Sequence, residues 1–100
     1  MDVGTPGHHI FIDVFKMDHL DKKIVEAARR NRAAGYSAAK LLLHLRDEAH
    51  VANGLDAMRY FMESFGWPLA RAKAVMSWSG LGGELSDEQI NLLVNPWLHE

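Results

Sequence analysis

Cysteine is absent from this chain of 100 residues. The chain therefore has no disulfide framework, no thiolate nucleophile and no thiolate metal site, and it suits a reducing compartment. Long apolar runs are absent too, because the longest are only a few residues, such as Leu41-Leu42-Leu43, whereas a membrane span needs roughly 20. The N-terminus has no basic segment followed by an apolar stretch, so we expect no signal peptide. These absences predict a cytoplasmic protein that makes no membrane contact.

Histidine is present six times, but it lacks the spacing of a helical metal site. His44 and His50 are six positions apart, which places them on different faces of a helix. His8 and His9 are adjacent, and adjacent side chains diverge. The i, i+4 histidine pair of a zinc-binding helix and the HExxH motif are both missing, so we expect no metal ion and no cofactor.

The sequence also lacks a recognisable catalytic constellation, which needs a base, a nucleophile and an orienting group in one cleft. Ser37 and Ser86 are accounted for as helix caps, and most acidic residues stand at helix starts, where the helix dipole favours them. The glycine-rich segment at residues 79–83, SGLGG, lacks the lysine and the preceding strand of a phosphate-binding loop. We therefore predict that the chain is not an enzyme.

Helix start and stop signals recur along the chain, in which 48% of the residues are hydrophobic. Gly35 and Pro96 are expected to end helices, and a capping box is expected where Ser86 precedes Gln89 by three positions. The sequence predicts a single all-α domain, a compact bundle of about five short helices. The residues expected to begin these helices are Asp18 or Asp21, Ser37, Asn53, Pro68 and Ser86.

The chain is expected to consist of a helical core and a separate N-terminal segment. Residues 17–98 form the predicted helical core. Residues 1–16 form an appendage or arm, because residues 9–15, HIFIDVF, have the β-branched and aromatic content of a strand with no second strand to pair with.

The segment at residues 55–78 predicts a helical hairpin rich in methionine and aromatic side chains. Gly66 suits a left-handed C-terminal cap, and Pro68 suits the first position of a new helix. A stripe of Met58, Met62 and Phe65 is expected to face the core. Tyr60 and Phe61 point away from that stripe, so another helix of this chain or a partner must cover them.

This surplus of apolar faces is the best indication of a binding surface in the sequence. Tryptophan and tyrosine are typical of binding hot spots, although a tryptophan at a helix end can equally cover the core. The leading hypothesis is a small non-enzymatic protein-interaction module, an adaptor or an immunity-type inhibitor. Its partner would be another protein or a second copy of the chain in a homodimer. The predicted partner-binding residues are Arg59, Tyr60, Phe61, Trp67, Arg71, Lys73 and Trp78.

Charge is unevenly distributed along the chain, whose net charge is -2. Residues 16–46 contain eight basic and three acidic side chains, whereas residues 47–100 contain three basic and eight acidic ones. The two parts can attract each other as ordinary solvated helix faces, or the basic part can meet an acidic partner. A nucleic-acid-binding protein is therefore the alternative hypothesis, with Lys22, Lys23, Arg29, Arg30, Arg32 and Lys40 as the contacting residues.

The pattern Ile24, Ala28, Gly35-Tyr36-Ser37, Leu41, Leu45 resembles the opening of a helix-turn-helix DNA-binding domain, with its glycine turn, serine cap and leucine-bearing helix. The resemblance implies a recognition helix at about residues 54–65. That segment departs from the family because it offers Asp56, Arg59 and Glu63, a net charge of -1, to a groove lined by phosphates.

A second resemblance covers roughly residues 55–94. The segment MRYFMESFGWPLARAK at residues 58–73 is similar to the helical hairpin of the C-terminal domain of the bacterial ribosomal large-subunit stalk protein, and LSDE at residues 85–88 is similar to the start of that domain's last helix. In that family the hairpin is a docking surface for translation factors, and Arg59 and Lys73 would be the counterparts of its basic residues. Pro68 departs from the family by replacing a glycine, and the family's strands are not evident here.

Overall fold

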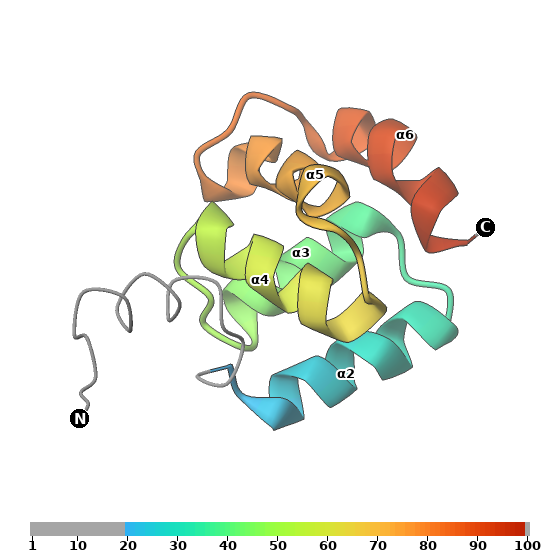
Figure 1. Cartoon of the computed structure of the whole chain (residues 1–100). Coiled ribbons are helices and arrows are strands. Elements are labelled where there is room, and N and C mark those ends of the chain that lie inside the picture. Colours follow the sequence, from blue (N-terminus) through green and yellow to red (C-terminus); the bar gives the residue numbers. More distant parts are fainter. Residues whose placement is uncertain (1–19, 100) are drawn as a thin grey trace, which may run out of the picture.

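The computed structural model describes residues 20–99, and every α-helix among them matches a predicted one (Figure 1). The helices are α2 (Lys22–Ala33), α3 (Ala38–Asp47), α4 (Gly54–Phe65), α5 (Leu69–Ala72) and α6 (Asp87–Leu98), with 3-10 turns η1 (Lys73–Ser77) and η2 (Ser79–Leu81). The described part of the chain contains no strand, only an isolated bridge between Trp78 and Leu85, so the all-α prediction is confirmed. The predicted arm at residues 1–16 lies outside the described residues. No helix in residues 20–99 is long and apolar enough to cross a bilayer.

Local capping explains where most of these helices begin. The side chains of Asp21, Ser37 and Asn53 accept hydrogen bonds from the backbone of the first turn of α2, α3 and α4. Ser86 and Gln89 form the expected capping box at the start of α6. These interactions lie within a few residues of each other, which is why the sequence predicts them.

Helix ends agree less well with the predictions. Gly66 has the expected left-handed conformation, with φ 68°, and ends α4. α3 ends at Asp47 without a glycine to stop it, because His50 adopts φ 59° and Val51 turns back to donate to the carbonyl of Leu45. The prediction that Pro96 ends the last helix is wrong, because α6 continues to Leu98 with Pro96 in its final turn.

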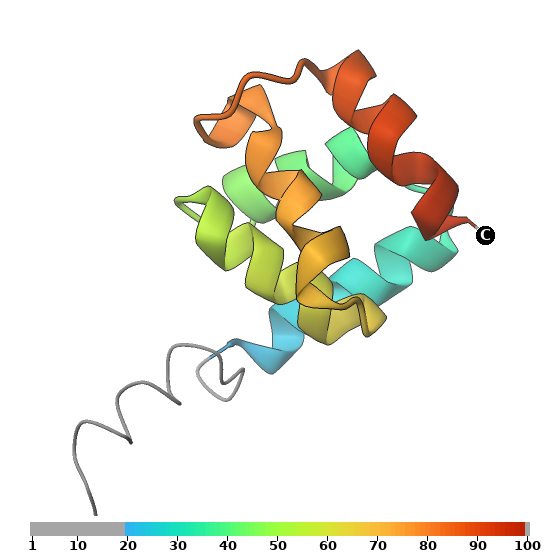
Figure 2. The same cartoon turned by 45° about the horizontal axis from the view of Figure 1, so that its top comes forward.

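The helices pack in a bundle in which several helices cover α4 (Figures 1 and 2). α4 lies between α2 on one side and the α5–η1 segment on the other, and α3 packs against both α2 and α6. α6 lies at the edge of the bundle in both views, where one of its faces meets α3 and η1. This peripheral position leaves the opposite face of α6 open to solvent.

The buried face of α4 differs from the prediction. Met58 is buried as predicted, but Met62 and Phe65 are only partly buried. Leu55 of the same helix is 42% exposed. The face that packs most closely includes Tyr60 and Phe61, together with Gly54, Ala57 and Ser64. α4 has neighbouring helices on more than one side, so Tyr60 and Phe61, which lie outside the predicted stripe, are buried as well.

Candidate functional site

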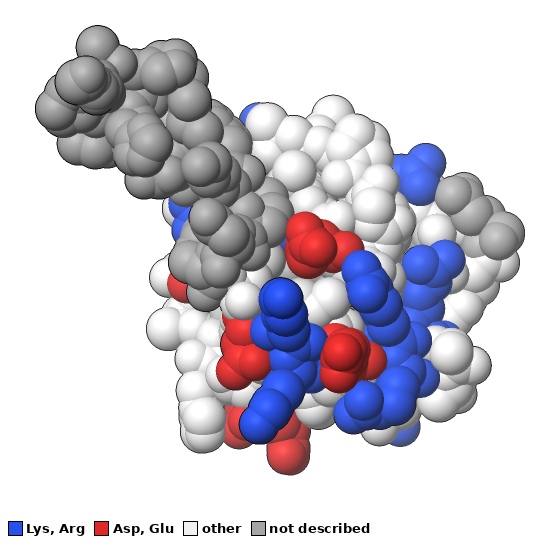
Figure 3. Space-filling model, turned by 60° about the horizontal axis from the view of Figure 1, so that its bottom comes forward, with Lys and Arg blue, Asp and Glu red and all other residues white. Residues whose placement is uncertain are grey.

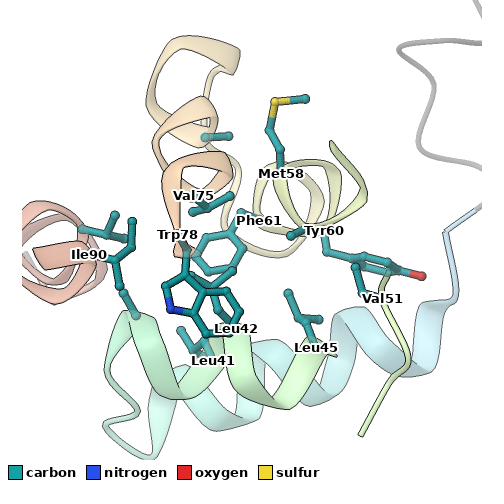
Figure 4. Close-up of a cluster of buried hydrophobic side chains, with 14 of the residues drawn as sticks. Leu41, Leu42, Leu45, Val51, Met58, Tyr60, Phe61, Val75, Trp78 and Ile90 are labelled. Carbon is teal, nitrogen blue, oxygen red and sulfur yellow. The ribbon is translucent and has the colours of Figure 1, made fainter. Parts of the chain in front are cut away.

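The aromatic side chains of the predicted docking surface lie in the core of the monomer. Tyr60 is 7% exposed, Trp67 is 6% exposed, and Phe61 and Trp78 are each 1% exposed. Figure 4 shows Phe61 and Trp78 facing the leucines of α3. The prediction that these four residues form a partner-binding patch is therefore wrong, because helices of the same chain already cover them.

One aromatic cluster joins the hairpin to α6. The Phe61 ring lies 5.2 Å from that of Phe65 and 5.4 Å from that of Trp67, measured between centroids. Trp67 in turn meets Trp97 of α6 edge to face at 5.9 Å. These separations are those of favourable aromatic pairs, so the tryptophan at the hairpin turn stabilises the packing of α6.

Trp78 has a second structural role at the start of α6. Its indole Nε1 donates a hydrogen bond of 2.6 Å to Oδ1 of Asp87, which is the first residue of that helix. Gly80 passes so close to the indole ring that an added Cβ would overlap it. Arg46 places its guanidinium over the same ring, 5.3 Å from the centroid.

The three cations predicted to steer a partner lie in different environments. Arg59 is mostly buried and forms an ion pair with Asp56 one turn earlier, with Nη1 and Oδ1 3.0 Å apart. Arg71 lies over the rings of both Trp67 and Trp97. Lys73 is exposed. Their role in partner binding stays a prediction, but two of them already interact with other side chains of the fold.

Two residues of the alternative nucleic-acid site bond to helix ends. Arg29 of α2 donates from Nε to the carbonyl of Ser64 at 2.9 Å and from Nη2 to that of Glu63 at 3.0 Å, at the C-terminal end of α4. Arg32 donates from Nε to the carbonyl of Leu98 at the end of α6. A positive charge at a helix C-terminus complements the helix dipole, so both arginines stabilise the bundle.

The other four basic residues, Lys22, Lys23, Arg30 and Lys40, are exposed. Arg30 and Lys40 line a hollow between α2 and α3 together with His44, but Asp47 and Glu48 line it too. Figure 3 shows acidic side chains interspersed with basic ones on the face around α2. The predicted recognition helix, residues 54–65, is α4, and its central position does not suit insertion into a groove.

The most exposed large apolar side chain in residues 20–99 is Leu92 of α6, at 80%. The opposite side of α6 is fully packed, with Ile90 and Val94 at 0% exposure and Leu98 at 1%. Leu93, which follows Leu92 on the same helix, is also exposed, at 41%. The residues that line a shallow hollow around Leu92 are Glu88, Gln89, Asn91, Asn95, Pro96 and His99.

Sequence reasoning missed this surface, although a signal for it was present. At 100° per residue, Glu88, Leu92, Pro96 and His99 fall on one face of a helix, opposite Ile90 and Val94. The expected helix end at Pro96 concealed the pattern, because it removed the last turn from consideration.

Metal-binding and titratable groups of the described residues offer no alternative site. In residues 20–99 no three His, Cys, Asp or Glu side chains lie where they could hold a metal ion together. Asp47 is the described carboxylate with a clear pKa change. A hydrogen bond from Arg46 at the protein surface lowers the pKa of Asp47 below its ordinary value.

Comparison with known proteins does not add a family to these observations. No family model matches this chain, and neither the curated proteins nor the solved structures contain a match to it.

Proposed function

We propose that this chain is a non-enzymatic protein-interaction module that binds its partner on the outward face of α6. The observation that supports this is the 80% exposure of Leu92 on a helix whose opposite face is completely buried. Burial of a leucine side chain is worth about 1.5–3 kcal/mol, so covering Leu92 would favour association. This surface replaces the hairpin as the docking site, because the hairpin aromatics are committed to the core.

The surroundings of Leu92 have the arrangement of a small interface. Pro96 extends the apolar surface by one helical turn, and Glu88, Gln89, Asn95 and His99 place polar groups around it. An apolar centre within a polar rim is typical of protein–protein contacts.

The position of α6 is held firmly before any partner arrives. Its Asn91 and Asn95 side chains accept hydrogen bonds from the backbone N–H groups of Ala39 and Ala38 in α3. The bond from Trp78 to Asp87 holds its first turn. A preorganised surface loses less conformational entropy on binding, which supports a docking role such as that of an adaptor or an immunity-type inhibitor.

Site-specific photo-crosslinking in cells would test this proposal. A benzophenone amino acid at position 92 should form adducts that map to one defined segment of one protein. The matched control is the same group at position 55, since Leu55 is an exposed leucine on α4. Absence of adducts at position 92, or equal adducts at both positions, would reject the α6 surface.

Nucleic-acid binding is the second candidate function, and the exposure of Lys22, Lys23, Arg30 and Lys40 favours it. Its test is binding to generic duplex DNA over a range of salt concentrations, because phosphate contacts weaken steeply as salt rises. Replacing Lys22 and Lys23 with Gln should reduce the salt dependence without disturbing the bundle. A chain that shows no affinity at low salt would rule this function out.

A further inference from the structure

We infer that the outward face of the helical hairpin, formed by α4 and the α5–η1 segment, is a docking site for residues 9–15 of the same chain. The inference does not use the α6 surface, so it stands apart from the proposed function. Its support comes from the side chains of this face, from the point at which the chain enters the fold, and from charge.

Exposed apolar side chains of the described residues gather in two places. The large ones are Leu55, Leu69, Met76, Leu92 and Leu93. The last two belong to α6, whereas the first three all belong to the hairpin, with exposed fractions of 42%, 39% and 38%. The hairpin therefore has an apolar face that is open to solvent, separate from the aromatic side chains that it buries.

Both halves of the hairpin present the same pattern of a leucine, a cation four positions later and a methionine three positions after that. The pattern consists of Leu55, Arg59 and Met62 in α4, and of Leu69, Lys73 and Met76 in the α5–η1 segment. Side chains with this spacing lie on one face of a helix, and residues three apart in a 3-10 turn eclipse each other. The two stripes lie close together, because a Cβ on Gly54 would be only 3.3 Å from Cα of Met76.

The chain enters the described fold beside α4. Leu20 is buried, and the N–H of Asp21 donates a hydrogen bond of 3.0 Å to the hydroxyl of Tyr60 in α4. Residues 16–20 span up to about 17 Å when extended, whereas a helix with its side chains is about 10–12 Å across. Residues 9–15 therefore reach from this point across α4 to the outward face of the hairpin.

The exposed surface of α6 is less accessible to this segment. α6 meets α2 through Arg32, which lies in the last turn of α2 and donates to the carbonyl of Leu98. The chain enters at the opposite end of α2, and the 12 residues of that helix span about 18 Å. Figure 1 accordingly shows the start of α2 and the whole of α6 on opposite sides of the bundle.

Residues 9–15, HIFIDVF, have the composition that the hairpin face requires. Five of the seven are apolar, and the segment contains Asp13 but no lysine or arginine. Lys73, in the middle of one stripe, is exposed, and opposite charges across an interface favour docking. A segment attached to the fold also has a high effective concentration, so contacts too weak to hold a separate molecule suffice to hold it.

Photo-crosslinking of the purified full chain tests the inference. A benzophenone amino acid at position 55 should form adducts with residues 9–15 of the same molecule, located by mass spectrometry after digestion. The same group at position 92 is the matched control and should form none with that segment. In a mixture of isotopically heavy and light chains, adducts within one molecule contain a single label. Mixed-label adducts at position 55, or no adduct with residues 9–15, would overturn the inference.

Methyl NMR of the methionines provides a second test, which needs no modified residue on the hairpin. Phe11→Ser combined with Phe15→Ser should shift the methyl signals of Met62 and Met76, because aromatic rings packed on these methyl groups would be lost. Leu92→Ser is the control and should leave both signals in place. Circular dichroism should show that the variants keep their helices. Unchanged methionine signals in the double phenylalanine variant would contradict docking of this segment.

These outcomes are distinguishable from a failure of the proposed function. An adduct between position 55 and residues 9–15, with no partner adduct at position 92 in cells, supports this inference and rejects the α6 surface. A defined partner at position 92, with no contact between position 55 and residues 9–15, overturns this inference and leaves the proposed function intact.

Discussion

The side-chain oxygen of Asn95 in α6 accepts a hydrogen bond of 2.7 Å from the backbone N–H of Ala38, the first residue of α3. One turn earlier, Asn91 accepts a bond of 2.8 Å from the N–H of Ala39. The N–H groups at the start of α3 therefore have acceptors in two helices' worth of chain: α6 supplies Asn91 and Asn95, and the N-cap Ser37 accepts from the N–H of Lys40. α6 thus acts as a cap for a helix more than fifty residues earlier in the chain.

Asn91→Ala and Asn95→Ala should each destabilise the fold by about 1–2 kcal/mol, because each leaves a helix N–H without its acceptor. Urea unfolding followed by circular dichroism would measure the loss. Asn95→Asp is the control, since it keeps an acceptor oxygen and should lose less. Equal stability of the alanine variants and the wild type would show that water replaces these caps at no cost.

Gly80→Ala should destabilise the fold by about 1–3 kcal/mol, because its methyl group would overlap the Trp78 indole and force a shift in a packed core. The Trp78 side chain would have to move away from Asp87, and its fluorescence should change with it. Ser79→Ala, at the exposed neighbouring position, should stay within about 0.5 kcal/mol of the wild type. A neutral Gly80→Ala would mean that the 79–84 loop can move away from the ring.

Arg29→Lys should destabilise the bundle by about 1 kcal/mol, although it conserves charge. A lysine ammonium cannot reproduce the two parallel bonds that the guanidinium makes to the carbonyls of Ser64 and Glu63. Arg30→Lys, one position further along α2, is the control and should be close to neutral. Chemical denaturation of the two variants side by side tests this, and an equal effect of both substitutions would contradict the proposed role of Arg29.

Tyr60→Phe should weaken the start of α2 by about 1 kcal/mol, because the tyrosine hydroxyl accepts a bond of 3.0 Å from the N–H of Asp21. Figure 4 shows the Tyr60 ring extending toward this end of α2. Hydrogen exchange should quicken at the Asp21 amide and in the first turn of α2. Tyr36→Phe, which alters the tyrosine in the α2–α3 turn, should leave those amides unchanged. Unaltered exchange in Tyr60→Phe would show that the bond contributes nothing measurable.

Prediction from sequence succeeded for features that depend only on residues close together in the chain, such as helix caps and turns. The caps Asp21, Ser37 and Asn53 act within one helical turn, and Gly66 adopts a left-handed conformation because it has no Cβ. The candidate binding site could not be predicted from such local interactions. Whether Tyr60 and Phe61 formed a surface or a core depended on which helices lie beside α4, and their spacing in the sequence contains no such information.

By itself the sequence determined the all-α class, the starting points of the helices and the turn of the hairpin, because helix propensity and capping are local effects. Tertiary structure alone decided how each helix is rotated in the bundle. It buried Tyr60 and Phe61, joined Asn95 to Ala38, and left Leu92 rather than Ile90 in solvent. The physical reason is that burial depends on the number and position of neighbours. α4 packs against α2 on one side and the α5–η1 segment on the other, whereas α6 lies at the edge, so similar apolar patterns produce a largely buried helix in one case and an exposed surface in the other.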